Sequence, residues 1–418
     1  MNSTRDRRTD VAIVGSGIVG ISIAHALVRD GLTVTLIDRE GVACGASRGN
    51  AGALAYTDVL PLASPGIMRK APRWLLDPAG PLTIRLGYLL PIAPWLFRFW
   101  RASFPAAAAS SMAAQVALMT LARSEMQRQV AEASLSHMLV SDGALELYES
   151  EAERDSARPN WDARGREGIR FEHVGRDAID KLQPGLDSRF SHGTFLPEWQ
   201  SVSDPYDFAV AFADKLRERG ALFRSGEVTA VGRREDGVVL RCADGAEICA
   251  KQAVIAAGAW SKSLATSVGD KIPLDTERGY NTTLPPGAFD LRRHLTFGGH
   301  GFVVTRLSSG IRVGGAVEFG GLRLPPNMRR ADVMLAKAKA FLPALDTTGG
   351  KKWMGYRPSL PDSLPVIGRS PRAPAVFYAF GHGHLGLTQS AATGRLIADL
   401  VAHRPTAIDV APFRPDRF

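Results

Sequence analysis

Residues 11–38 read VAIVGSGIVGISIAHALVRDGLTVTLID, and this stretch decides the expected fold. An apolar run precedes a Gly-x-Gly-x-x-Gly turn, a helical pattern follows the turn, and a second apolar run ends in an acid. Gly15 permits the tight turn, Gly17 lets a pyrophosphate approach the bare backbone, and Gly20 lets the helix pack closely on the strand. The stretch therefore predicts a βαβ unit of the Rossmann type.

The helix after this turn predicts a site for phosphate groups. Ile18 and Val19 stand at its N-terminus, where N–H groups lack partners within the helix and the helix dipole favours an anion. Asp38, at the end of the second strand, can accept the hydrogen bonds of a ribose diol. A glycine turn alone is weak evidence, but a turn between a strand and a helix, followed by this acid, predicts a dinucleotide site. The alternative is a βαβ turn with a structural role only.

Composition limits the class of protein and its partners. The chain has 418 residues, a formal net charge of +9 and a hydrophobic content of 45%, which predicts one large or two smaller domains with a buried core. The basic balance favours anionic partners such as phospholipid or an anionic substrate. Because no basic motif interleaved with aromatic residues is present, nucleic acid is not expected as a partner. The pattern says nothing of the oligomeric state.

The cysteines and the N-terminus indicate a cytoplasmic protein. Cys44, Cys242 and Cys249 form neither a Cys-x-x-Cys motif nor a cluster with metal-ligand spacing, so no metal site is expected and a reducing compartment is favoured. The N-terminal residues run into the first strand without the apolar core of a signal peptide.

Residues 81–100, PLTIRLGYLLPIAPWLFRFW, form a strongly apolar and aromatic segment. Arg85, Pro91, Pro94 and Arg98 interrupt it, so its apolar stretch is shorter than the ~20 residues that a bilayer-spanning helix needs. Two interpretations stay open. The segment is either a proline-broken helix of the core or a surface element that rests on lipid headgroups. The second would place the protein peripherally on the inner face of the cell membrane.

The rest of the chain alternates between helical and extended patterns. Residues 40–56 form a loop of small residues that permits close approach to a flat ligand. Helices are expected over 105–138, in the polar stretch up to 183, and over 206–219. Strands are expected at 143–148, 223–231, 238–242, 247–250, 253–258, 280–284, 301–305, 311–315 and 376–380. After the last strand, residues 381–386 (GHGHLG) repeat the opening device, since a glycine-rich turn again leads into a helix.

Several motifs follow one another along nearly the whole chain. They are IVGSGIVG (13–20), LIDRE (36–40), NAG (50–52), IRVGG (311–315), RP (357–358), PVIG (365–368) and GHG with LG (381–386). Together they resemble the glycine oxidase and D-amino-acid oxidase superfamily of FAD enzymes. Within it, the chain is most similar to the small subunit of bacterial D-amino-acid dehydrogenases.

This resemblance implies an α/β fold with two domains. A discontinuous Rossmann-like FAD-binding domain would comprise 1–85, 196–270 and 345–418, and a substrate domain on an antiparallel sheet would comprise 86–195 and 271–344. The implied cofactor is FAD, held without a covalent bond because no cysteine lies near the 381–386 turn. Beside the residues of the first turn and Asp38, the implied FAD contacts are Arg39, Ser47, Asn50, Ala51, Gly52, Val228, Gly258, Gly381, Gly383, Leu385 and Gly386.

The resemblance also implies a small set of catalytic residues. Arg357 occupies the position that binds the substrate carboxylate in the family, and its planar guanidinium suits a bidentate grip. Tyr280 matches a tyrosine that assists the same carboxylate, and His382 matches a residue that abuts the flavin. His384 stands where several dehydrogenases carry threonine. The alternatives are a structural ion pair for Arg357 and core packing for Tyr280.

The implied activity is the oxidative deamination of D-amino acids or cyclic D-imino acids, such as D-hydroxyproline, by hydride transfer to flavin. Electrons would pass to a quinone or another acceptor that is not oxygen. Two alternatives stay open: an oxidase of glycine, sarcosine or D-amino acids that uses dioxygen, and a non-catalytic FAD-binding assembly protein.

Overall fold

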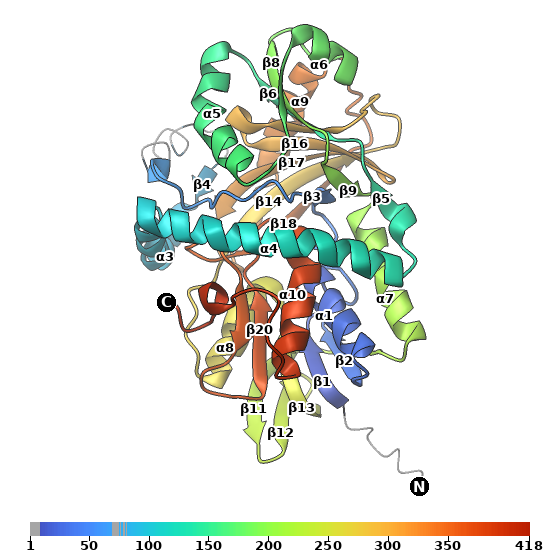
Figure 1. Cartoon of the computed structure of the whole chain (residues 1–418), viewed down its shortest axis with the longest axis vertical. Coiled ribbons are helices and arrows are strands. Elements are labelled where there is room, and N and C mark those ends of the chain that lie inside the picture. The colour runs from blue at the N-terminus through green and yellow to red at the C-terminus, as the bar shows by residue number, and fades with distance from the viewer. Residues whose placement is uncertain (1–8, 69–74, 76, 78–79, 81) are drawn as a thin grey trace.

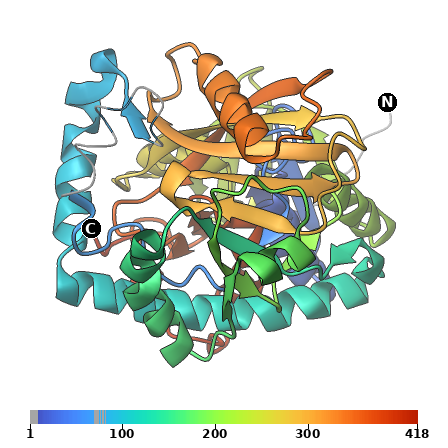
Figure 2. The ribbon, with the colours of Figure 1, turned by 90° about the horizontal axis from the view of Figure 1, so that it is seen from above.

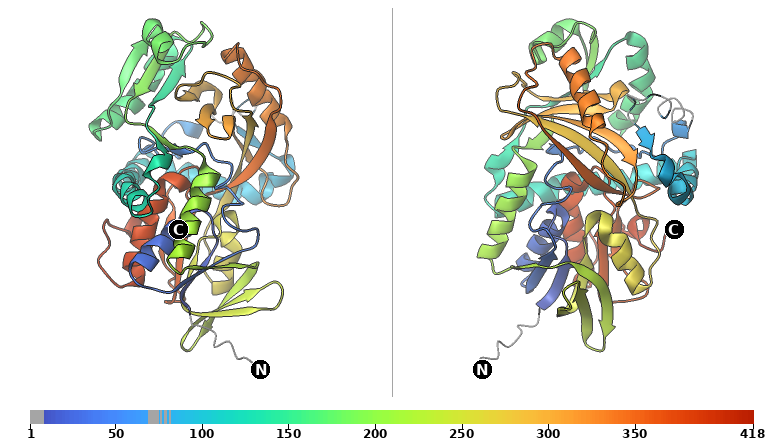
Figure 3. Two further views of the ribbon diagram at one scale, coloured as in Figure 1. Left: turned by 90° about the vertical axis from the view of Figure 1, so that its right-hand side faces the viewer. Right: turned by 180° about the vertical axis from the view of Figure 1, so that it is seen from behind.

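The computed structural model describes residues 9–68, 75, 77, 80 and 82–418. Two large sheets lie one above the other along the longest axis (Figure 1), and both views of Figure 3 show the same two layers. The lower sheet contains β1, β2 and β20, and the upper sheet contains β6, β14, β16 and β17. A mixed α/β fold with several sheets is therefore confirmed.

The lower sheet carries the βαβ unit predicted from residues 11–38. β1 (Thr9–Val14) lies between β2 (Val34–Asp38) and β13 (Glu247–Ile255), and all three strands run parallel. Two more parallel strands extend this core, and three antiparallel strands complete the sheet. These are β10 (Leu222–Ser225) and β20 (Val376–Phe380), then β11 (Val228–Arg234), β12 (Gly237–Cys242) and β19 (Val366–Arg369).

Helices cover both faces of this sheet because its strands are apolar on both sides. Ile13 and Val254 face the helices α1, α7 and α10, whereas Ala12 and Ile255 face α8 on the opposite side. Their bounds are α1 (Ile18–Arg29), α7 (Pro205–Glu218), α8 (Ser261–Val268) and α10 (Gly386–Val401). α1 and α10 approach so closely that a Cβ at Gly394 would lie 2.5 Å from the carbonyl oxygen of Ser22.

The predicted strand boundaries are wrong at two places in this sheet. Residues 247–250 and 253–258 were expected as separate strands, but β13 is a single strand that pairs with β12 first and with β1 and β20 afterwards. Conversely, the strand expected at 223–231 is broken at 226–227 into β10 and β11. The N–H of Gly226 donates to Asp38 O at 2.9 Å as the last contact with β2, and the chain then pairs with β12 instead.

The upper sheet is largely antiparallel and has the strand order β18-β14-β17-β16-β15-β6-β8-β7, with β4 beside β17. Its strands are β4 (Leu82–Ile84), β6 (Ala144–Tyr148), β7 (Glu172–Gly175), β8 (His192–Leu196), β14 (Asp275–Leu284), β15 (His294–Phe297), β16 (Phe302–Leu307), β17 (Gly310–Phe319) and β18 (Lys351–Ser359). α5 (Glu151–Arg166), α6 (Arg176–Leu182) and α9 (Arg329–Phe341) accompany these strands (Figure 1). A short third sheet joins β3 (Ala53–Leu54), β9 (Gln200–Val202) and β5 (Leu139–Val140).

The position of β18 differs from the expected domain boundary. Residues from 345 onward were assigned to the FAD-binding domain, yet β18 pairs with β14 along its whole length, from Lys351 opposite Thr283 to Ser359 opposite Asp275. The chain therefore returns to the lower sheet only after Ser359. β18 contains Lys, Trp, Tyr and Arg and carries none of the continuous apolar pattern that marks a parallel core strand.

The long helix α4 (Pro105–Glu132) crosses between the two layers and packs along α10 (Figure 1). Of the helices in the described part of the chain, it is the one long and apolar enough, by length and composition, to cross a membrane. One face of α4 is occupied by protein, because Leu118, Ala122 and Met126 are buried in the core of the lower layer.

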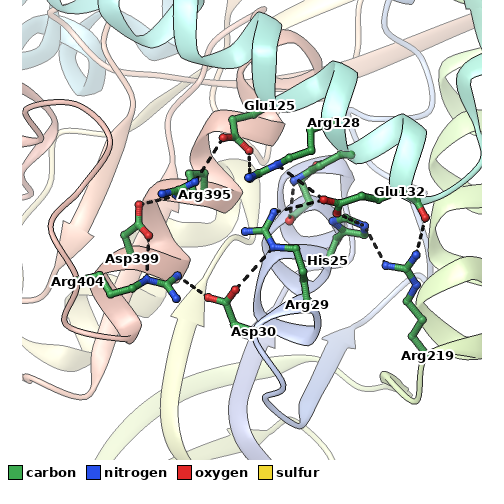
Figure 4. A network of polar contacts seen from close by, with 12 residues as sticks. His25, Arg29, Asp30, Glu125, Arg128, Glu132, Arg219, Arg395, Asp399 and Arg404 are labelled. Atoms are coloured by element: carbon green, nitrogen blue, oxygen red, sulfur yellow. Dashed lines mark hydrogen bonds and ion pairs between the residues drawn. The ribbon is translucent and has the colours of Figure 1, made fainter.

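Ion pairs join the C-terminal half of α4 to the helices beneath it (Figure 4). Glu125 pairs with Arg395 of α10, which also donates to the buried Asp399 at 2.8 Å. Arg404 donates to Asp399 at 3.1 Å and pairs with Asp30 at the end of α1. A charge-bearing layer thus ties α4, α10 and α1 together.

The apolar segment 81–100, described from residue 82 onward, is partly core and partly exposed, and its contact with lipid headgroups stays a prediction. It forms β4, a short turn of 3-10 helix and α3 (Leu89–Ala102), which lies at one edge of the molecule (Figure 2). Ile92 and Trp95 are buried against Phe319. On the outer side, Leu86 and Leu90 expose 85% and 87% of their surface. One face of α3 is therefore core and the other is an exposed apolar surface.

Candidate active site

A cavity of about 850 Å³ runs from the turn between β1 and α1 to β14, β17 and β18 of the upper sheet. Most of the residues predicted for a cofactor contribute to its wall: Gly15, Gly17, Ile18, Val19, Asp38, Arg39, Ser47, Asn50, Ala51, Val228, Gly258, Gly383, Leu385 and Gly386. Gly20, Gly52 and Gly381 do not line it. The three predicted catalytic residues Arg357, Tyr280 and His382 also lie along this wall.

The glycine turn has the close contacts that its spacing predicts. Gly15 has a φ of +109°, and a Cβ there would lie 2.4 Å from Ala256 O. A Cβ at Gly20 would lie 2.0 Å from Gly15 O, so this glycine serves the packing of α1 on the strand. Gly17 instead faces the cavity, beside the Ser47 hydroxyl, which accepts the N–H of Ile18 at 2.9 Å. Bare backbone is thus presented where an anion would lie.

Asp38 stands at the end of β2, as predicted. One carboxylate oxygen accepts the N–H of Ser16 at 2.8 Å, and the other accepts the N–H groups of Glu40 and Gly41 at 2.9 and 3.1 Å. These bonds orient the carboxylate, which keeps free lone pairs toward the cavity for a diol. Beside it, the Arg39 guanidinium stacks 3.8 Å from the centre of the Trp260 ring.

The small-residue loop after β2 is held by polar side chains of the upper sheet. Asn50 donates to Ser47 O at 2.9 Å and accepts the N–H of Gly52 at 2.8 Å. Arg312 of β17 donates to Asn50 O at 2.5 Å, and Asn281 of β14 donates to Gly49 O at 2.7 Å. The roles of Arg312 and Asn281 were not predicted. The signal for Arg312 was a lone charge inside the strand motif IRVGG.

This half of the cavity fits a dinucleotide. The glycine turn offers backbone to a pyrophosphate, Asp38 offers a carboxylate to a ribose, and the loop over 45–52 has little side-chain bulk. A Cβ at Gly15 or Gly20 would collide with backbone atoms, so the cradle depends on glycine at these positions.

Arg357 of β18 is the cationic group at the other end of the cavity. Its guanidinium lies directly over Gly279 of β14, where a Cβ would come within 2.4 Å of an Nη atom. One N–H donates to Ala316 O at 2.9 Å, and this is the one hydrogen bond of the guanidinium with a described residue. Burial lowers the pKa of Arg357, and Glu277 opposes that shift. The remaining donors are available to a ligand in the cavity.

Glu277 is the buried counter-charge of Arg357. The two residues are opposite each other in the β14–β18 register, although no ion pair within 4.0 Å joins them. Burial raises the pKa of Glu277, and the Arg357 charge lowers it. One carboxylate oxygen has no hydrogen-bond partner in the described structure. A saturated structural ion pair, the alternative role for Arg357, is not what the geometry shows.

Tyr280 is placed differently from its predicted role. Its hydroxyl donates to Glu318 Oε1 at 3.0 Å and accepts the N–H of Asn327 at 3.0 Å. Glu318 also forms a fully buried ion pair with Arg278 at 3.1 Å. The single hydroxyl proton of Tyr280 is thus donated to Glu318, which favours the alternative that Tyr280 has a packing role in the core. A contact between Tyr280 and the substrate carboxylate stays a prediction.

The 381–386 turn lies beside Arg357. The N–H of Gly383 donates to Pro358 O at 2.7 Å, which ties the turn to the end of β18. The Nε2 of His382 contacts the Thr393 hydroxyl at 2.9 Å, and that hydroxyl donates to Gln389 O, so Nε2 carries the proton. Burial lowers the pKa of His382 to about 3. Its ring is therefore neutral and braces the turn against α10, while a contact with flavin stays a prediction.

His384 lines the cavity and its side chain is exposed there. Partial loss of hydration and the Arg357 charge lower its pKa to about 4, and Asp58 has the opposite effect. The imidazole is consequently neutral near pH 7 and can donate one hydrogen bond and accept another. His384 lines the same wall as Arg357.

Comparison with known proteins agrees with this geometry. A family model described as FAD dependent oxidoreductase matches residues 10–400. A D-amino-acid oxidase of Bradyrhizobium diazoefficiens is 35% identical over 98% of both chains, and a D-amino acid dehydrogenase of Sinorhizobium medicae is 30% identical over 98% of this chain and 99% of that one. The crystal structure of glycine oxidase from Geobacillus kaustophilus superposes with a TM-score of 0.78, at 24% identity, over 98% of this chain and 99% of that chain.

The cavity and these matches define a flavoenzyme class. The chain belongs to the FAD dependent oxidoreductase family, and the predicted resemblance is confirmed. Its cofactor is FAD. The glycine turn, Asp38 and the loop over 45–52 line a cavity that fits a dinucleotide, and their contacts with FAD stay a prediction.

Proposed function

We propose that this protein is a D-amino-acid dehydrogenase that oxidises D-amino acids or cyclic D-imino acids. The substrate loses a hydride from Cα, for which bound FAD supplies the acceptor, and a proton from nitrogen, to give an imine. An open-chain imine then takes up water and releases the 2-oxo acid and ammonia, whereas a cyclic imine remains as the product. The names of the curated relatives support the substrate class.

The observation that carries this proposal is the open guanidinium of Arg357. Its side chain is half-buried at the cavity wall, has one hydrogen bond with the described residues, to the carbonyl of Ala316, and keeps its other donors for a carboxylate. Charge-assisted bonds to both carboxylate oxygens would fix Cα in one orientation. The neutral His384 ring next to it adds a polar contact without adding a second positive charge near the amine. A FAD-binding assembly protein without turnover would have no use for this arrangement.

The outer face of α3 supports a membrane-bound acceptor such as quinone. Leu90 exposes 87%, Phe97 56% and Trp100 41% of their surface, which is unusual for apolar residues so close together. Arg98 and Arg101 are exposed on the same helix, which contains no acidic residue. Apolar side chains flanked by arginines suit the headgroup region of an anionic leaflet. In this proposal the protein is cytoplasmic and rests peripherally on the inner face of the membrane.

A second candidate is an oxidase that passes electrons to dioxygen. The 35% identical relative named D-amino-acid oxidase favours it. The two candidates share the substrate site and differ only in the acceptor.

One experiment tests both the substrate class and the electron acceptor. The purified yellow protein is mixed anaerobically with a panel of D-amino acids and cyclic D-imino acids, and the flavin absorbance near 450 nm is followed. Bleaching by at least one of these compounds, but not by its L-enantiomer, is the expected result. Air is then admitted: slow recovery of colour, with fast recovery on addition of a quinone, supports the dehydrogenase, and fast recovery in air supports the oxidase. Flavin that no member of the panel bleaches would refute the proposed substrate class.

A further inference from the structure

The cavity continues beyond Arg357 into the upper sheet, where it meets a second set of polar and aromatic side chains. Glu146 of β6 and Thr296 of β15 line it there, together with Trp161 and Arg164 of α5 and Trp199 after β8. None of these residues belongs to the part of the wall that fits the dinucleotide. This end is therefore the region that a substrate side chain would reach.

Glu146 is a carboxyl group without a charged partner in this region. One of its carboxylate oxygens lies over Gly298, where a Cβ would be only 3.1 Å away. No cation of the described chain lies within the 4.0 Å ion-pair distance of it. Burial raises the pKa of Glu146, while Arg164 and Tyr148 act in the opposite direction. Glu146 is half-buried, and a partly desolvated carboxylate without an ion pair gains stability when a ligand supplies the missing charge.

The nearest cation, Arg164, is committed elsewhere. Its Nε donates to Thr57 O at 3.0 Å, and its guanidinium lies 3.7 Å from an Asp58 carboxylate oxygen and 4.6 Å from the centre of the Trp161 ring. His294 carries no charge near pH 7, because burial lowers its pKa to about 4. Two carboxyl groups, Glu146 and Asp58, thus face one guanidinium.

We propose that Glu146 is the anchor of a side-chain subsite that takes a cation, an ammonium or guanidinium group at the end of the substrate side chain. The subsite rests on the proposed function, because Arg357 holds the α-carboxylate at the other end of the same cavity. Trp161 and Trp199 supply apolar walls for the methylene chain between the two charged ends. His384, which is neutral near pH 7, lines the same cavity and adds no further charge to it.

Pairs of substrates of similar size that differ in the charge of the side chain test this subsite. D-lysine is compared with D-norleucine, and D-arginine with D-citrulline, in a dye-linked assay of the FAD-loaded enzyme. We expect the charged member of at least one pair to have the higher kcat/KM. The variant Glu146→Gln keeps the size of the side chain. In this variant the kcat/KM of the charged member divided by that of the neutral member falls about tenfold to a hundredfold, since a hydrogen bond between two charged groups is lost. The kcat/KM of the neutral member stays within about twofold.

The control variant is Glu172→Gln, which removes an exposed carboxyl from β7 of the same sheet and leaves both ratios unchanged. The melting temperature of each variant shows that it is folded. Equal kcat/KM within both pairs, or a ratio that Glu146→Gln does not change, overturns the subsite while D-norleucine still demonstrates the proposed function. An equal loss for charged and neutral substrates would instead place Glu146 in the chemistry and also overturns the subsite. No turnover with any of the four compounds would count against the proposed function itself.

Discussion

The contact between Arg357 and Gly279 predicts that a single methyl group, placed outside the reacting atoms, disables substrate binding. In Gly279→Ala the new Cβ would lie 2.4 Å from an Nη of Arg357, 2.5 Å from Cζ and 2.9 Å from Nε. Ordinary contacts begin at about 3.4 Å, so the guanidinium must move by about 1 Å. The end of an arginine side chain can move this far, and an alanine suits the strand backbone of Gly279. Folding should therefore tolerate the change while the position of the anchor is lost.

The size of the effect follows from the bonds that Arg357 makes. A displaced guanidinium loses at least one charge-assisted hydrogen bond to the substrate carboxylate, worth about 1.5–3 kcal/mol, or about tenfold to a hundredfold in kcat/KM. Misplacement of a bound substrate by about 1 Å has a cost of similar size in kcat. We therefore expect KM to rise and kcat to fall, with steady-state kinetics under anaerobic dye-linked conditions as the assay. The melting temperature should change by no more than a few degrees.

Three further variants make the result specific. Arg357→Lys keeps the charge without the planar fork, and the double variant with Gly279→Ala should lose less than the sum of the two single losses, because both act on one contact. Gly175→Ala serves as the control, since a Cβ at this glycine meets nothing within 4 Å. A folded Gly279→Ala enzyme with unchanged kcat/KM would show that the position of the guanidinium does not matter, and Arg357 would lose its assigned role.

Three other predictions concern the cofactor, the membrane and pH. Acid precipitation should release all yellow colour into the supernatant, and colour in the pellet would mean a covalent flavin. Binding of the protein to anionic vesicles should be reversible and should be weakened by salt and by Trp100→Ser, while dye-linked activity is retained. If the protein does not bind these vesicles at low salt, α3 has a structural role only. The pKa of His382 falls from an ordinary 6.5 to about 3 on folding, so between these pH values the unfolded chain binds a proton that the folded chain does not. The free energy of unfolding therefore drops as the pH falls through this window, by about 1.4 kcal/mol per pH unit. Thermal melting from pH 7 to 4 should show a smaller slope for His382→Asn than for the exposed-site control His137→Asn, and equal slopes would contradict a buried neutral ring.

The membrane prediction uses Trp100 alone for a structural reason. Trp95 and Trp100 both belong to the apolar segment 81–100, and the sequence does not distinguish them. Trp95 is buried, stacks on Phe99 with ring centres 5.2 Å apart, and donates its indole N–H to Ser359 O at 3.3 Å. Its replacement by serine would damage the core, whereas Trp100 is exposed and can be changed without that cost.

Local spacing explains why the dinucleotide end of the site could be predicted and the substrate end could not. The glycine turn and Asp38 lie within one βαβ unit, and each residue acts through neighbours that the spacing itself defines. Arg357 was found through resemblance, but its position depends on strand register between segments far apart in sequence, because its guanidinium lies over Gly279, two residues along β14 from its register partner Glu277. Glu146 was not predicted, because a single acid in an apolar strand carries no local sign of what faces it.

The residues around Ser359 connect the proposed substrate anchor, Arg357, to α3, the helix proposed to contact the membrane. Arg357, the proposed substrate anchor, ends β18 together with Pro358 and Ser359, and Pro358 accepts the N–H of Gly383 from the glycine-rich turn. Ser359 O accepts the indole N–H of Trp95, so the inner face of α3 rests on the same strand end whose arginine faces the cavity. α3 thus contacts, through its inner face, the backbone that positions Arg357, while its outer face is exposed. A protein that took electrons from a substrate in this cavity and gave them to a membrane acceptor would have its substrate anchor and its lipid-facing surface held by one rigid element.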